Sequence, residues 1–213
     1  SRRAAREQEP RAQTLRVLCS EPYLRRLLML VVISTVAVTA VDYVFKSVVA
    51  DTIDPERLGP FFARFYLVLN AIALVVQVAF ASWLLGRFGV NHALLVLPVL
   101  LLAGVVGFVA VPGLIAVGLL KGADGTLRHS VHRTGLEVLY LPVPREIRER
   151  YKAVIDGVGS RGGQAAASLV ILGAVAVGAD VVHLAIGLGV LAVGWVVVLF
   201  GIKPHYVDLF RHN

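Results

Sequence analysis

Cysteine and charge are both scarce in this sequence of 213 residues. Cys19 is the only cysteine, so no disulfide can form within the chain, and a small disulfide-stabilised secreted domain is excluded. Only 16% of the residues are charged, against about a quarter in soluble proteins, whereas 57% are hydrophobic and the mean hydropathy is +0.77. A soluble or disordered chain is therefore excluded, and we expect an all-α polytopic membrane protein held in a lipid bilayer.

The apolar residues gather in six blocks, each long enough to cross about 30 Å of hydrocarbon as a helix. The blocks are Leu27–Ala50, Phe61–Leu85, Ala93–Val111, Leu114–Leu141, Ala153–Val177 and His183–Ile202. Together they predict a transmembrane domain over residues 27–203, with a basic cytoplasmic linker or interfacial segment before it (1–26) and a cytoplasmic tail after it (204–213). The chain starts at Ser1 without a signal-peptide pattern, and we expect it to be part of a longer polypeptide.

The distribution of basic residues predicts the orientation of the six blocks. Fourteen of the 21 lysines and arginines lie on the side that carries both ends of the chain, whereas Arg57 alone lies on the other side. Because cytoplasmic loops are enriched in Lys and Arg, we predict a multi-pass protein of the inner (cytoplasmic) membrane with both termini cytoplasmic. The formal charge of +7 is then a topology signal, and no basic segment with base-reading side chains indicates a nucleic-acid partner.

The polarity of the blocks repeats after three. The first, fourth and fifth blocks carry ionisable residues and the second carries amides, whereas the third and sixth are almost wholly apolar. A repeat with an odd number of spans inverts its second copy, and such 3+3 inverted repeats form each half of a major facilitator superfamily transporter. We therefore expect six transmembrane helices in a 3+3 inverted repeat, corresponding to one half of that fold.

Ionised side chains inside the blocks mark the candidate site, because intramembrane charges are costly and face a cavity or another protein surface. Asp42 and Lys46 are four residues apart and can pair on one helical face, either as a structural ion pair or as a cavity-lining cation with its counter-ion. The candidate substrate-binding residues are Lys46, Asn70, Lys121, Asp124, Arg128 and Arg161. The candidate charge pairs or gates involve Asp42, Arg133, Glu137, Lys152 and Asp156.

The same side chains predict the kind of solute. Basic groups inside the blocks exceed acidic groups by two, which suits an anionic polar solute. His129 and His132 lack further ligands at metal spacing, and no serine or cysteine lies beside a base at a pocket-forming turn. We therefore expect no metal, no cofactor and no enzymatic activity.

Several of these residues carry a family resemblance. Residues 42–46 (DYVFK), 136–142 (LEVLYLP), 151–156 (YKAVID) and 161–163 (RGG) resemble helices seven to twelve of the nucleotide (ATP/ADP) translocase family. The resemblance implies the C-terminal half of a major-facilitator-like carrier that exchanges nucleotides, with an N-terminal six-helix half or a second copy as its partner. The sequence looks most like the free-living bacterial members of that family, and this resemblance implies cytoplasmic domains fused to the membrane unit.

Two hypotheses about function stay open. The first is a half-transporter that moves an organic anion by alternating access, with nucleotides exchanged by ATP/ADP-type antiport as the candidate solutes. The alternative is a non-transporting membrane anchor or signalling module of a larger protein with fused cytoplasmic regulatory domains. Leu136 stands where the nucleotide carriers of the resembling family have a lysine, which favours the alternative.

Overall fold

The computed structural model describes residues 22–128, 133–140, 152 and 154–212, and within these ranges it contains helices and no strand. The prediction of an all-α protein is therefore confirmed. In chain order the elements are α2 (Pro22–Thr52), α3 (Pro55–Val75), the π-helical η1 (Val76–Phe80), α4 (Ala81–Ala110), α5 (Leu114–Leu127), α6 (Arg133–Leu139), the π-helical η3 (Ile155–Gly159), α8 (Ser160–Ala176) and α9 (Val181–His212).

Four helical stretches of the described chain are long and apolar enough to cross a membrane. They are Pro22–Thr52, Pro55–Ala79, Ala93–Ala110 and Val181–Gly201, and they correspond to the first, second, third and sixth blocks. The expected fourth block contains the shorter helices α5 and α6, and the expected fifth contains η3 and α8. The structure is thus compatible with a multi-pass membrane protein.

Some expected boundaries differ in the structure. Helix α2 begins at Pro22, so the last residues of the expected linker 1–26 are helical, while residues 1–21 lie outside the described ranges. Proline is well tolerated in the first turn of a helix, where its missing N–H has no intrahelical partner. The tail expected at 204–213 is helical as far as His212. The segment between the second and third blocks, residues 86–92, is also helical, because α3, η1 and α4 follow one another without a break.

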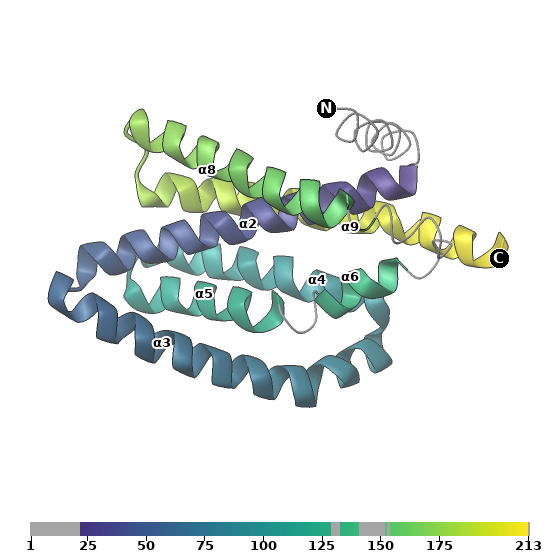
Figure 1. Ribbon diagram of the computed structural model, residues 1–213, viewed down its shortest axis with the longest axis horizontal. Coiled ribbons are helices and arrows are strands. Elements are labelled where there is room, and N and C mark those ends of the chain that lie inside the picture. Colours follow the sequence, from purple (N-terminus) through teal and green to yellow (C-terminus); the bar gives the residue numbers. More distant parts are fainter. Residues whose placement is uncertain (1–21, 129–132, 141–151, 153, 213) are drawn as a thin grey trace, which may run out of the picture.

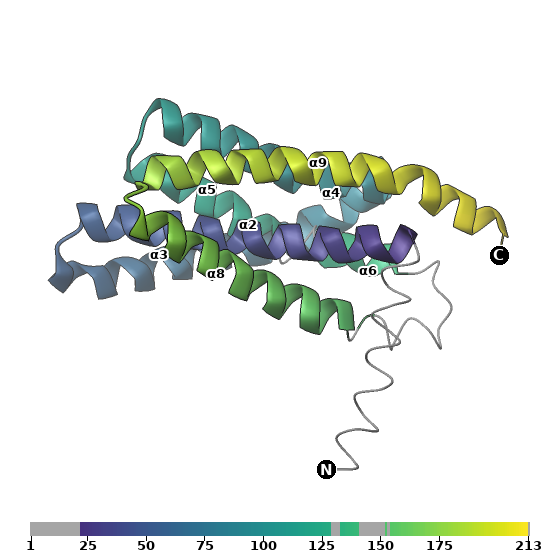
Figure 2. The ribbon, with the colours of Figure 1, turned by 90° about the horizontal axis from the view of Figure 1, so that it is seen from above.

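The helices pack around α2. Helix α2 contacts α8 and α9 on one side and α5 on the other, while α5 also contacts α3 and α4, and α4 contacts α9. Figure 1 shows α2 between the α8–α9 pair and the group formed by α3, α4 and α5. Seen from above in Figure 2, α4 and α9 lie on one side of α2 and α8 lies on the other.

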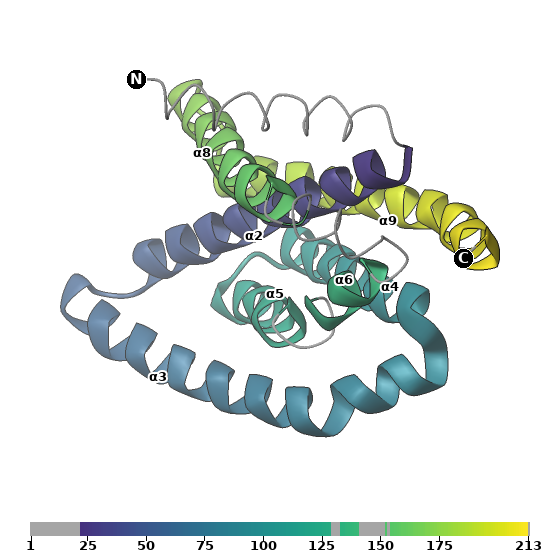
Figure 3. The same cartoon turned by 45° about the vertical axis from the view of Figure 1, so that its right-hand side comes forward.

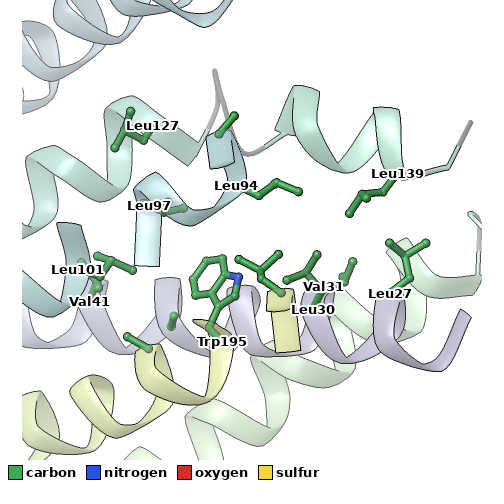
Figure 4. Packing of buried hydrophobic residues seen from close by; sticks show 14 of the residues in the cluster. Leu27, Leu30, Val31, Val41, Leu94, Leu97, Leu101, Leu127, Leu139 and Trp195 are labelled. Carbon is green, nitrogen blue, oxygen red and sulfur yellow. The ribbon is translucent and has the colours of Figure 1, made fainter. Parts of the chain in front are cut away.

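The main hydrophobic core lies where α2, α4 and α9 meet. Leu30, Leu97, Leu101 and Trp195 are at most 1% exposed, and Figure 4 shows the Trp195 ring among the leucines of α2 and α4. A second cluster lies around Phe45 and Phe108. This core joins the first block to the third and the sixth. The third and sixth blocks, which are almost wholly apolar, are therefore partly covered by protein.

Much of the outer surface is apolar. Exposed side chains include Leu67, Val78, Ile115, Leu119 and Val177, each more than two-thirds exposed. Soluble monomers rarely expose large contiguous apolar patches, whereas a lipid-facing surface does so at no cost. The exterior therefore agrees with the hydropathy of the sequence.

Helix α3 is an outer helix that approaches the others mainly through α5 (Figure 3). Leu69 is its one buried residue, and it packs over Gly125 of α5. A Cβ atom at Gly125 would lie 2.8 Å from Leu69 Cδ2, closer than real Cβ contacts. The absence of a side chain at Gly125 therefore allows the close approach of α3 and α5.

A tight turn joins α8 to α9. Gly178 has a φ of 85°, which glycine adopts without strain. Its N–H donates to the Val175 carbonyl, and the Ala179 N–H donates to the Ala174 carbonyl, which is the Schellman arrangement that ends many helices. Asp180 then accepts hydrogen bonds from the backbone N–H groups of Val182 and His183 and caps the start of α9.

Candidate functional site

A network of charged side chains joins α2 to α5. Asp42 of α2 accepts a hydrogen bond from Lys121 Nζ of α5 at 2.9 Å, and its other carboxylate oxygen lies 2.6 Å from Lys46 Nζ. The pair of Asp42 and Lys46 expected from the sequence is therefore present. Two lysines from different helices share this one carboxylate.

A second carboxylate continues the network along α5. Asp124 Oδ1 accepts hydrogen bonds from Arg128 Nη2 at 2.5 Å and from Arg128 Nε at 3.0 Å. Lys121 Nζ lies 4.0 Å from Asp124 Oδ2. The spacings of three and four residues in the sequence place these side chains on one helical face.

Arg128 also connects α5 directly to the backbone of α2. Its Nη1 donates to the carbonyl oxygen of Ser34 at 3.1 Å. The Ser34 hydroxyl donates to the Val31 carbonyl at 2.9 Å, so the side chain of this buried serine is satisfied within its own helix. Ser34 is not among the residues that the sequence singles out, because a backbone carbonyl acceptor has no signature in residue type.

Exposure increases along the network from Asp124 to Lys46. The exposed fractions of the side chains are 1% for Asp124, 9% for Lys121, 16% for Arg128, 34% for Asp42 and 55% for Lys46. A low-dielectric environment strengthens the attraction between paired charges but makes each unpaired charge costly. We infer that Lys121, Asp124 and Arg128 are held in place by one another, whereas Lys46 has room for a further partner.

Aromatic side chains adjoin the network where α2 meets α3. Phe45, next to Lys46 in the chain, has its ring centroid 4.6 Å from that of Phe65. The Phe61 and Phe65 rings are stacked at 6.0 Å, and the Phe62 and Tyr66 rings are stacked at 6.2 Å. Such offset pairs contribute beyond their buried area and give this part of α3 a row of ring faces.

The expected gate residues have a different pairing from the one that the sequence indicates. Both carboxylate oxygens of Glu137 accept hydrogen bonds from Lys152 Nζ, at 2.7 and 2.6 Å, and Lys152 Nζ also lies 5.8 Å from the centre of the Tyr140 ring. The spacing of four residues in the sequence instead favours a pair of Arg133 with Glu137 and a pair of Lys152 with Asp156. The side chains of Arg133 and Asp156 lie outside the described residues.

Two candidate substrate-binding residues are not brought to the network. Asn70 is exposed on α3, next to the buried Leu69 but on another face of the helix. Arg161 is exposed on α8, which packs on α2 opposite α5 (Figure 1). A helical wheel gives the angle of a residue about its own axis but not the neighbouring helix, so the sequence grouped these two with residues of other helices.

The described side chains offer no evident metal site. Among them, no group of three or more His, Cys, Asp or Glu residues is close enough to hold a metal ion. His129 and His132 lie outside the described ranges. The contacts that the structure shows within the network are ion pairs and hydrogen bonds.

Comparison of the chain with protein-family models, curated proteins and solved structures finds no match in any of the three.

Proposed function

We propose that this chain is a six-helix membrane unit, one half of a major-facilitator-like carrier, that moves an organic anion by alternating access. Nucleotides, exchanged as in the ATP/ADP carriers that the sequence resembles, are the candidate solutes. In this proposal both termini lie on the cytoplasmic side of the inner membrane. The partner is a second six-helix half, either upstream in the same polypeptide or a second copy.

The charge balance of the α2–α5 network is the observation that carries the proposal. Three cationic side chains, Lys46, Lys121 and Arg128, share two carboxylates, Asp42 and Asp124. The network therefore has one unbalanced positive charge, and an anion would neutralise it. Lys46 is the most exposed member, so it is the group that an entering anion reaches first.

The geometry supports a division of roles among the three cations. An anion that binds Lys46 would compete with Asp42 for its ammonium group, and Asp42 would keep its bond to Lys121. Asp124 would keep Arg128 against the Ser34 carbonyl. In this mechanism Lys46 contacts the solute, whereas Lys121 and Arg128 are positioning residues that hold α2 and α5 together while Lys46 exchanges Asp42 for the anion.

The packing pattern supports the inverted repeat. The first block packs on the fifth and sixth (α2 on α8 and α9), and the fourth packs on the second and third (α5 on α3 and α4). The first also packs on the fourth, and the third on the sixth. If block one is exchanged with block four, two with five and three with six, these pairs are reproduced, as a two-fold relation between two three-helix units requires. The few contacts between α2 and α3 are the exception, because within the described residues α5 and α8 show no contact of that extent.

The aromatic cluster supports an aromatic anion over a small inorganic one. The rings of Phe62 and Tyr66 are half-buried and stacked beside the segment that carries Lys46. Stacking of a base on an aromatic side chain contributes about 1–3 kcal/mol. A solute with a planar ring and a phosphate group would use both the ring faces and the lysine.

The proposal is tested by uptake of radiolabelled ATP into vesicles that contain the protein in its native polypeptide and are preloaded with ADP. We expect saturable uptake of ATP, and we expect inorganic phosphate not to be taken up to the same extent. Lys46→Ala should weaken the apparent affinity by about tenfold or more, because a hydrogen bond between charged groups contributes about 1.5–3 kcal/mol. Lys46→Arg keeps the charge and should retain most of the uptake.

Arg57→Ala is the matched control. It also removes one positive charge, but from an exposed side chain that lies 4.0 Å from Asp54 and outside the network. We expect its uptake to stay near that of the unmodified protein. Equal affinity in the Lys46→Ala and Arg57→Ala proteins would refute the role of Lys46.

The membrane anchor is the second candidate function, and one observation favours it. Lys121 and Arg128 both have carboxylate partners within the chain, so the buried part of the network is satisfied without a solute. This hypothesis expects no saturable flux of any anion and an unchanged fold in Lys46→Ala. The uptake measurement therefore distinguishes the two functions.

A further inference from the structure

A narrow groove lies between α8 and α9, with α2 as its floor. Its lining comes from Val36 and Ala40 of α2, from α8 between Ala166 and Ile171, and from α9 between His183 and Leu191. Its volume is about 290 Å³. Every lining side chain is apolar except that of His183, which lies at one end.

The groove follows from the way α8 and α9 leave their common turn. The two helices diverge from the Gly178 turn (Figure 2), and each packs on α2. Small residues keep the space between them open, since Ala166 and Gly187 line it. A Cβ atom added at Gly187 would meet no atom within 4 Å.

The length of the groove matches one leaflet of a bilayer. His183 lies in the first turn of the apolar stretch Val181–Gly201, and Leu191 lies at its middle. Eight residues at 1.5 Å per residue give about 12 Å, and half of a 30 Å hydrocarbon core is about 15 Å. The groove therefore extends from the membrane boundary nearly to the midplane.

The volume of the groove is too small for a helix. A cylinder of helix width and about 12 Å length would occupy roughly 1,100 Å³, several times the groove's volume of about 290 Å³. A helix with its side chains is about 10–12 Å wide, whereas a chain of methylene groups at van der Waals contact is about 4 Å thick. The space thus accommodates a single hydrocarbon chain.

We propose that this groove binds one acyl chain of a membrane phospholipid, with the headgroup at the His183 end. The polarity along the groove matches an amphiphile, because His183 is half or more exposed at the boundary end and the rest of the lining is apolar. Val170, which lines the groove, and Val190, which lies beside the lining on α9, are both exposed and apolar, so the groove opens toward lipid. This inference requires only that the helices span a membrane, and it is independent of the transported solute.

The test is photolabelling in bilayers of dioleoyl phosphatidylglycerol that contain a small share of the same lipid with a diazirine midway along one acyl chain. The labelled residues are identified by peptide mass spectrometry. We expect the lining residues of α9 to be labelled more strongly than Ile186 and Val190, which are exposed outside the lining on the same half of this helix. Gly187→Leu should lower labelling of the lining by about tenfold, because the leucine displaces several methylene groups from buried contact.

Two further variants are controls for the effect of Gly187→Leu. Gly187→Ala fills little of the space and should lower labelling only slightly. A small effect of alanine beside a large effect of leucine would show that leucine acts by filling the groove and not by unfolding the protein. Gly173→Leu adds the same side chain at an exposed glycine of α8 that also has no atom within 4 Å of its Cβ and is outside the lining, and it should leave labelling unchanged.

Equal labelling of lining and outward residues, or unchanged labelling in Gly187→Leu, would overturn the proposal. Weak labelling of the lining together with a change of oligomeric state in Gly187→Leu would also overturn it, because it would assign the groove to a second copy of the chain.

Discussion

Replacement of Asp124 by asparagine is the most direct test of the α2–α5 network. The Asp124 carboxylate is 1% exposed and accepts hydrogen bonds of 2.5 and 3.0 Å from Arg128. Asparagine has nearly the same shape but no charge, so Arg128 would remain largely buried opposite a neutral amide. Removing one partner of a buried ion pair costs about 3–5 kcal/mol, and we expect the free energy of unfolding to fall by that amount.

The assay is reversible unfolding in mixed micelles for a double-mutant cycle of Asp124→Asn and Arg128→Met. The double variant has no uncompensated charge at this site, so it should lose less stability than the sum of the single variants, with a coupling energy of about 1–3 kcal/mol. Asp51→Asn is the control, because Asp51 is exposed near the end of α2 and should change stability by less than about 0.5 kcal/mol. A loss below about 1 kcal/mol in Asp124→Asn, or strict additivity in the cycle, would show that the pair does not hold α2 against α5.

Further predictions concern packing, capping and the interhelical ion pair. Gly125→Leu should destabilise the protein by about 1–3 kcal/mol through overpacking, and the added substitution Leu69→Ala should restore part of that loss in the same unfolding assay. Hydrogen bonds from the backbone N–H and the ring of His183 hold the pKa of Asp180 below its ordinary value of 3.8. The cap therefore stabilises the start of α9 above about pH 4 and is lost as the pH falls through the lowered pKa, so the thermal unfolding curves of the unmodified protein and Asp180→Ala should differ at neutral pH and converge in acid. Glu137→Gln breaks a pair whose carboxylate is half exposed, and we expect it to cost at most about 1 kcal/mol; a larger loss would mean that this pair holds α6 in place.

The sequence determined those features of this protein that depend on local geometry. The apolar blocks predicted helices because a backbone in hydrocarbon must satisfy its hydrogen bonds within the segment. The pair of Asp42 and Lys46, and the shared face of Lys121, Asp124 and Arg128, followed from residues three and four apart on one helix. None of these contacts requires knowledge of a neighbouring helix.

The tertiary structure alone decided which helices meet. Lys121 reaches Asp42 over 79 positions of sequence, Arg128 reaches the Ser34 carbonyl over 94, and Lys152 pairs with Glu137. Helix neighbours are chosen by the summed packing of many apolar side chains and by close approach at small residues, and a list of polar residues does not contain that information. For the same reason the sequence assigned Asn70 and Arg161 to a common site, while the fold carries each on an exposed face of a different helix.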